Sequence, residues 1–433
     1  MRKIRLAIVI STLMLALPAS AEQTEARNVI LMITDGVGFN GWMAADYYAG
    51  LAGEQPYQVE RPDGTQPHLY GMTHWALNPV NANGEILEKP ELGEIDGVRE
   101  QGYDPSTRWQ AFENAFRNDF GPVGIEYSSY ADSAAAGTAL QTGRKTVNGR
   151  INQDWQGRDL TTIAEVADAE GLATGSVSSV MASHATPATT WAHNVSRDNY
   201  GAIFREMVSG ELDVVMGAGH PHYDSSGQPL EHDERDYQYV GGEDFWGRIS
   251  GPDHFNGYTF IDNPEEFKKI ARGEAVPEKL LGIARSNSTL QALREDMPSS
   301  EDSPSGVAFV DHVPDLPTMS QAALNVVDQN DEGFFVMIEG GAPDWMAHAN
   351  NMPRFIEEQL DFNRAVSAVI EWVENNSNWD ETLLIVTSDH ETGGIWGRGT
   401  YHNEEGGDVA GSRDEQALEK ARFHPDDDEF NEF

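Results

Sequence analysis

The chain has 433 residues, no cysteine and a formal charge of −42, because 29 Lys and Arg residues stand against 71 Asp and Glu residues. This length is sufficient for one large domain or two with a substantial core. Without cysteine, disulfides and thiolate metal sites are excluded, and the acidic charge disfavours nucleic acid and anionic membranes as partners.

The first 21 residues have the pattern of a secretory signal peptide. Met1 to Arg5 are basic, residues 6–17 are mostly apolar, and an Ala-x-Ala cleavage pattern ends at Ala21. The apolar stretch is short for a membrane span, so an N-terminal anchor is the weaker alternative. We expect a mature chain that starts at Glu22 and is periplasmic or secreted.

Apolar runs and caps predict alternating strands and helices in the rest of the chain. Short, nearly continuous apolar runs are typical of buried parallel strands, which indicates an α/β fold. We expect strands at 28–34, 172–181, 212–216, 334–338 and 383–388. We expect helices that begin near Ser133, that run from a cap at Asp159 to Gly171, and that cover 316–327 and 354–373.

Two polar stretches rich in Gly and Pro interrupt this pattern. They cover about 50–108 and 220–303, and neither has a sustained strand or helix period. We interpret both as surface insertions in one domain that covers 22–433.

Side chains that can bind metals follow three of the predicted strands. They are Asp35, then Glu339 with Asp344 and His348, then Asp389 with His390. The carboxyl ends of parallel strands meet at one edge of an open sheet, where ligands collect. The pattern therefore predicts a centre of divalent cations with oxygen and nitrogen ligands, which suits Zn²⁺, Mg²⁺ or Mn²⁺.

A serine opens the helix predicted near this centre, in the string Asp132-Ser133-Ala134. A helix start favours an anion, but serine is also a preferred N-cap, which is the ordinary explanation. No Gly-x-Ser-x-Gly elbow surrounds Ser133, so an α/β-hydrolase is disfavoured. The neighbouring cation centre favours Ser133 as a metal-activated nucleophile.

The strand at 172–181 leads to His184-Ala-Thr186-Pro187, and Arg197 follows. Arginine matches the oxygens of phosphate, although a surface ion pair is the alternative for Arg197. A nucleotide-binding loop at 137–146 is disfavoured because its spacing departs from the P-loop pattern.

In this order and spacing, the motifs resemble the alkaline phosphatase family, over residues 28 to 394. His184 and Trp345 resemble the marine bacterial branch. The resemblance implies a three-layer α/β/α sandwich with a mostly parallel sheet. It also implies hydrolysis of small phosphate monoesters through a phosphoserine, and it allows a homodimer.

The resemblance also implies roles for individual residues. Ser133 would be the nucleophile and Arg197 would clamp the phosphate oxygens. Asp389, His390 and Asp35 would hold the zinc that binds and activates Ser133, with Asp35 shared with a magnesium.

A second zinc and the magnesium complete the implied centre. Asp344 and His348 would hold the second zinc, which stabilises the leaving oxygen. Thr186 and Glu339 would hold the magnesium, and His184 would contact a magnesium-bound water.

One family feature is missing. Family members carry a further histidine on the second zinc, in a Gly-x-His-Thr setting, whereas only His402 and His424 follow His390 here. We expect the sequence to stop short of that segment. Two alternatives stay open: a phosphodiesterase of the same superfamily, and a non-catalytic phosphate- or metal-binding relative that lacks one zinc ligand.

The acidic charge predicts adaptation to high salt, because ions screen the repulsion that weakens such a fold in dilute buffer. A generally acidic exported protein is the alternative. We expect the unfolding temperature to rise between dilute buffer and molar NaCl, as calorimetry at both salt concentrations would measure. A level or falling unfolding temperature would rule out the halophilic interpretation.

Overall fold

The computed structural model describes residues 26–51, 55, 58, 67–68, 77–87, 90–100 and 131–393. The expected signal peptide, most of the expected insertion at 50–108, and His402 and His424 lie outside these residues. Within them, no helix combines the length and the apolar character that crossing a bilayer requires.

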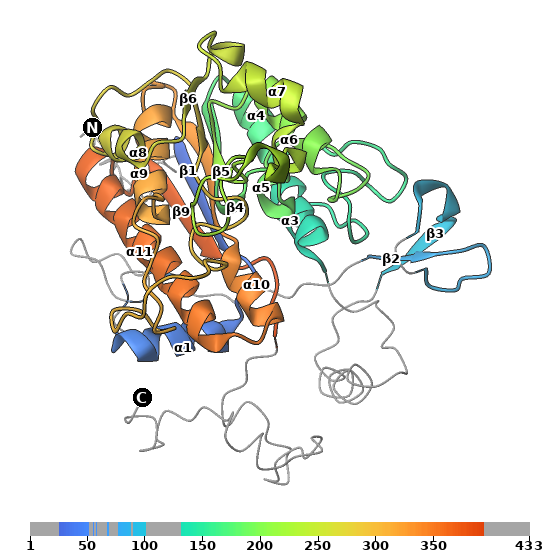
Figure 1. Ribbon diagram of the computed structural model, residues 1–433. Helices are drawn as coiled ribbons and strands as arrows, with labels where there is room; N and C mark the ends of the chain where they lie inside the picture. The colour runs from blue at the N-terminus through green and yellow to red at the C-terminus, as the bar shows by residue number, and fades with distance from the viewer. Residues whose placement is uncertain are drawn as a thin grey trace, which may run out of the picture.

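Seven strands form the central sheet, in the order β6-β7-β5-β4-β8-β1-β9 (Figure 1). They are β1 (Asn28–Thr34), β4 (Ala173–Met181), β5 (Val214–Ala218), β6 (Thr259–Ile261), β7 (Leu280–Ile283), β8 (Phe334–Gly340) and β9 (Thr382–Thr387). All neighbouring pairs in this sheet are parallel. Because β1 lies between β8 and β9, with Ile33 opposite both Glu339 and Thr387, the three ligand-bearing strand ends are adjacent.

Helices cover both faces of the sheet, which confirms the predicted α/β class and its layers (Figure 1). The main helices are α1 (Phe39–Ala49), α3 (Ser133–Thr142), α4 (Ile163–Ala169), α5 (Ala185–Ala188), α6 (Tyr200–Ser209), α7 (Glu243–Ile249), α8 (Pro264–Ala271), α9 (Leu316–Val327), α10 (Ala342–His348) and α11 (Met352–Asn376). Successive strand residues point to opposite faces. In β1, Ile30 and Met32 pack with α8, α9 and α11, whereas Leu31 and Ile33 pack with α4, α6 and α7.

The N-terminus of α4 differs from the prediction. Thr162, rather than Asp159, is the N-cap: its Oγ1 accepts a hydrogen bond from the backbone of Glu165, whose carboxylate accepts one from the backbone of Thr162. This reciprocal Thr-x-x-Glu capping box satisfies two backbone donors at once, which a single aspartate cap does not. The side chain of Asp159 instead accepts a hydrogen bond from Gln153.

The region from 220 to 303 is not only a surface insertion, contrary to our interpretation. Its strands β6 and β7 form one end of the main sheet, and Phe267 and Ile270 of α8 belong to the main core. These strands have only three and four residues, too few to produce a recognisable apolar run. In the other expected insertion, the described part contains a separate antiparallel pair, β2 (Leu77–Val80) and β3 (Gly97–Glu100).

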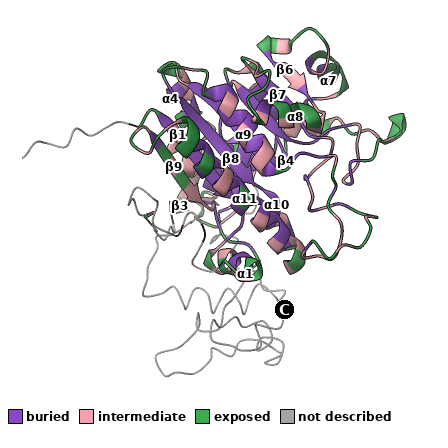
Figure 2. Cartoon of the chain, turned by 90° about the vertical axis from the view of Figure 1, so that its left-hand side faces the viewer, coloured by how far each residue is buried: buried purple, intermediate pink, exposed green. Residues whose placement is uncertain are grey.

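Strand β9 is less buried than its apolar sequence predicts. It forms the other edge of the sheet (Figure 2). Within the described part of the chain, Leu383 and Ile385 of this strand are 46% and 40% exposed. Leu384 and Val386 point to the opposite face, where they pack against the core that contains α11. Composition alone therefore does not distinguish this edge strand from the central ones.

Glu358, on the buried side of α11, provides a test of stability against pH. It is 4% exposed, and burial, with contributions from Asp361 and Glu357, raises its pKa to about 8. Because the folded-state pKa lies above the unfolded one, the folded state loses stability as the pH rises from about 4.5 to 8. Glu358→Gln is expected to increase the free energy of unfolding at pH 9 by up to several kcal/mol, at about 1.4 kcal/mol per pKa unit, with little effect at pH 4.

Urea unfolding at both pH values measures this effect. The matched control is Glu371→Gln, at an exposed position of the same helix, which should change neither value. An equal effect of Glu358→Gln at pH 4 and pH 9 would contradict the prediction.

Candidate active site

The site lies where β1, β8 and β9 end. Asp35 follows β1 directly and is fully buried, and its backbone N–H donates to the carbonyl of Gly340 at 2.9 Å. Gly36 has φ +73°, and a Cβ there would lie 2.6 Å from Oδ1 of Asp344. Only glycine therefore allows the chain to turn here while Asp344 lies beside it.

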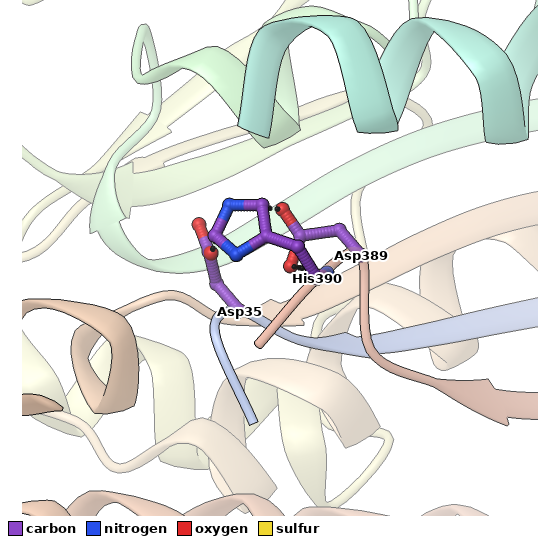
Figure 3. A group of neighbouring side chains, drawn as sticks. All are labelled: Asp35, Asp389 and His390. Atoms are coloured by element: carbon purple, nitrogen blue, oxygen red, sulfur yellow. Dashed lines mark hydrogen bonds and ion pairs between the residues drawn. The ribbon is translucent and has the colours of Figure 1, made fainter. Parts of the chain in front are cut away.

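Four side chains converge on one point at this edge. Nε2 of His390 lies 3.3 Å from Oγ of Ser133, 3.3 Å from Oδ2 of Asp389 and 3.6 Å from Oδ1 of Asp35. Figure 3 shows the two carboxylates on either side of the imidazole. One nitrogen cannot satisfy three partners, and among the described residues the two carboxylate oxygens accept no hydrogen bond. The donor set of Asp35, Asp389 and His390 fits a divalent cation.

This arrangement differs from a serine-hydrolase triad. In a triad, a carboxylate orients the histidine through Nδ1 while Nε2 faces the serine. Here Asp35 and Asp389 both face Nε2, and Nδ1 lies 3.3 Å from Oγ1 of Thr392. The geometry therefore supports His390 as a metal ligand and does not match the histidine base of a triad.

A second set of ligand atoms shares Asp35. It consists of Asp35, His184 and Glu339, all buried. Oγ1 of Thr186 donates to Oδ2 of Asp35 at 3.2 Å, and Glu339 accepts a short hydrogen bond from Ser178. Oε1 of the buried Glu339 has no hydrogen-bond partner among the described residues, so this group of oxygen atoms also fits a cation.

The carboxylates of the site repel one another. Burial, and then Asp389, Asp344 and Glu339, raise the pKa of Asp35 well above its usual value. Burial also raises the pKa of Glu339, to about 8. A bound cation would instead lower the pKa values of these carboxylates, because it stabilises the ionised form that burial disfavours.

His184 stays neutral in this surrounding. Burial, and then the charge of Arg197, lower its pKa to about 3. Nη2 of Arg197 lies 3.4 Å from Nε2 of His184, so Nε2 accepts and Nδ1 carries the proton. A protonated Nδ1 is a donor that suits a water next to a cation. Trp345 packs edge-on against the ring, with centroids 5.4 Å apart.

Asp132 and Ser133, which are adjacent in the sequence, make different contacts. Asp132 is the N-cap of α3, since its carboxylate accepts from the backbone of Ala135 at 2.9 Å, and this leaves the hydroxyl of Ser133 facing His390. The other oxygen of Asp132 accepts from Nη1 of Arg197 at 3.1 Å. Arg197 therefore has an ion pair, as the alternative stated, and its partner is Asp132, the residue directly before Ser133.

Asp344 and His348 form a looser pair on α10. Nε2 of His348 lies 3.5 Å from Oδ1 of Asp344, and the histidine side chain is 70% exposed. No third acidic or histidine side chain joins them among the described residues. The site residues thus all lie at one end of the sheet, with His348 at the exposed margin.

Sequence reasoning missed two hydroxyl groups of this site. Ser178, in β4, donates to Glu339, and Thr392 contacts both Asp344 and His390. Single Ser and Thr residues are too common to produce a pattern, and only the spatial neighbourhood reveals these two.

Comparison with known proteins identifies the family. The profile described as Alkaline phosphatase matches residues 125–422. The chain belongs to the alkaline phosphatase family. Alkaline phosphatase 4 of Bacillus subtilis is 30% identical over 385 residues, which cover 86% of this chain and 63% of that protein. Alkaline phosphatase 3 of the same organism is 29% identical over 269 residues, which cover 61% of this chain and 49% of that protein.

A solved structure of the family supports the same conclusion. The cold-active alkaline phosphatase of Shewanella sp. is 26% identical, with a TM-score of 0.53 over 87% of this chain and 71% of that one. The resemblance stated from the motifs is therefore confirmed at the level of the family. This chain spans less than two thirds of the length of either Bacillus relative.

Proposed function

We propose that this chain hydrolyses phosphate monoesters through a phosphoserine on Ser133. The observation that carries the proposal is the convergence of Ser133 Oγ and His390 Nε2 with one oxygen each of Asp35 and Asp389. Neither oxygen accepts a hydrogen bond from any described residue. A hydroxyl at the start of a helix, beside a cation site and an arginine, meets the needs of phosphoryl transfer.

The reaction proceeds in two displacements. Oγ of Ser133 attacks phosphorus, the bond from phosphorus to the ester oxygen breaks, and the alcohol leaves. Water then attacks the phosphoserine, which releases phosphate and restores the hydroxyl of Ser133. Arg197, which Asp132 holds at 3.1 Å, is positioned to bind the equatorial oxygens in both steps.

We propose two zinc ions and one magnesium as cofactors. Asp35, Asp389 and His390 would hold one zinc, and Asp344 and His348 the other. Asp35, Thr186 and Glu339 would hold magnesium, with His184 next to it through water. Bound there, the cations would favour ionisation of the serine and offset charge on the attacking and leaving oxygens.

Substrate comparison tests the proposal against its two rivals. The purified chain, supplied with zinc and magnesium, is assayed on an aryl phosphate monoester and on the matching diester. We expect faster hydrolysis of the monoester, and loss of activity with a chelator. Preference for the diester would favour a phosphodiesterase, and zinc binding without turnover of either would favour a non-catalytic relative.

We also propose that the protein is exported. The basic and apolar residues 1–21, with the Ala-x-Ala pattern, support the proposal. Fractionation of cells that express the full sequence would test it, with the mature chain expected outside the cytoplasm and its N-terminus at Glu22. A full-length chain retained in the cytoplasm would contradict export.

A further inference from the structure

Thr392 lies between the ligand pairs of the two proposed zinc sites. Its hydroxyl is 2.5 Å from Oδ1 of Asp344 and 3.3 Å from Nδ1 of His390. The residue is 8% exposed, so water does not compete freely for these contacts. One hydroxyl therefore contacts a predicted ligand of each of the two proposed zinc sites.

The backbone fixes Thr392 in this place. Its N–H donates to the carbonyl of Gly36 at 2.9 Å, so the segment after β9 is tied to the turn that follows Asp35. The next residue, Gly393, has φ +81°, and a Cβ there would lie 2.9 Å from the carbonyl of Ala347 in α10. The hydroxyl is therefore held between β1, β9 and α10 by its surroundings.

The donor and acceptor properties of the three groups determine the direction of both hydrogen bonds. A carboxylate only accepts, so the hydroxyl of Thr392 must donate its single proton to Asp344. The oxygen of Thr392 can then only accept from His390, which places the imidazole proton on Nδ1. Nε2 is left with its lone pair, and this is the atom that faces Asp35, Asp389 and Ser133.

We propose that Thr392 is a positioning residue that sets the tautomer of His390 and orients Asp344, and so couples the two zinc sites through one hydroxyl. The proposal rests on the proposed function, since it assigns zinc to these ligands. Ligand histidines generally donate their second ring nitrogen to a partner, and loss of such a partner typically costs about 10- to 100-fold in metal affinity or activity. Here the partner of the histidine is at the same time the partner of a ligand in the neighbouring site.

Three variants test the proposal by zinc binding. Thr392→Val keeps the shape and removes the hydroxyl, whereas Thr392→Ser keeps the hydroxyl. Thr174→Val is the matched control, because Thr174 is also buried but lies at the N-terminal end of β4, away from the site. Its hydroxyl has no hydrogen-bond partner among the described residues. The affinity of the metal-free chains for Zn²⁺ alone is measured by competition with a chromophoric chelator.

We expect Thr392→Val to bind zinc about 10- to 100-fold more weakly at both sites, and Thr392→Ser and Thr174→Val to match the wild type. Zinc affinities of Thr392→Val within twofold of the control would overturn the proposal. So would a loss confined to one site, because the bridge contacts both. Zinc affinity is measured without turnover. Equal zinc affinities of Thr392→Val and the wild type would therefore overturn this proposal and leave the proposed function standing.

Nuclear magnetic resonance of ¹⁵N-labelled histidine gives a second readout on the wild-type chain, independent of whether a variant folds. In the zinc-loaded protein, the ring of His390 is expected to carry its proton on Nδ1, in slow exchange with water. Zinc bound through Nδ1, or a proton on Nε2, would overturn the proposal.

Discussion

Replacing Ser133 with alanine is expected to lower the turnover of an aryl phosphate by roughly 10³-fold or more, as for other lost nucleophiles. The substitution removes only the hydroxyl group, and its oxygen, Oγ, is the atom proposed to bond to phosphorus. Stability should change little, because Asp132 and not Ser133 caps α3. Zinc content should stay close to that of the wild type, because Asp35, Asp389 and His390 remain.

Turnover, acid-trapped phosphoprotein and bound zinc measure this prediction together. Ser320→Ala is the matched control: Ser320 is also buried in a helix, α9, where its hydroxyl donates to the carbonyl of Leu316, far in sequence from the site. The control should keep both turnover and phosphoprotein. Undiminished turnover in Ser133→Ala would show that another group attacks phosphorus.

The sequence predicted the central strands well because burial on both faces leaves a clear signature. The run at 28–34 is β1, the run at 172–181 contains β4, and the run at 334–338 lies within β8. Side chains on both faces of β4 and β8 are buried. The helix at 316–327 is α9, and its stripe of apolar residues faces the sheet. Metal-type ligands at the ends of such strands could be recognised because few other roles explain them.

The sequence could not give the strand order or the distances within the site. No local sequence pattern indicates that β1 lies between β8 and β9. That strand order brings Asp35, Glu339 and Asp389 together. Short strands such as β6 lack a periodic signal, and the hydroxyls of Ser178 and Thr392 lack any. Local pattern predicts elements, whereas the contacts that tune ligands depend on tertiary packing.

Asp35→Asn is expected to change stability in opposite directions with and without metal. In the metal-free chain at pH 8, burial and the nearby Asp389 and Glu339 oppose the ionised form of Asp35, whose pKa is raised. Stability is lost as the pH rises above the unfolded-state pKa of about 4, so removing the charge should stabilise the metal-free chain by at least about 1 kcal/mol at pH 8. The amide oxygen of asparagine can still accept from Thr186, and its NH₂ group can donate to Asp389.

With zinc and magnesium the order should reverse, because Asp35 belongs to both groups of ligand atoms. Metal that binds only the folded state stabilises it by about 4 kcal/mol at a concentration 1,000 times the Kd, and the variant would forfeit most of this. Unfolding temperatures of the variant and the wild type are measured with a chelator and with metal, which gives the direction of the stability change in each condition. The control Asp380→Asn, at an exposed position, should change neither unfolding temperature. A variant less stable than the wild type without metal would mean that Asp35 is held by protein contacts; a variant equally stabilised by metal would mean that the cations bind elsewhere.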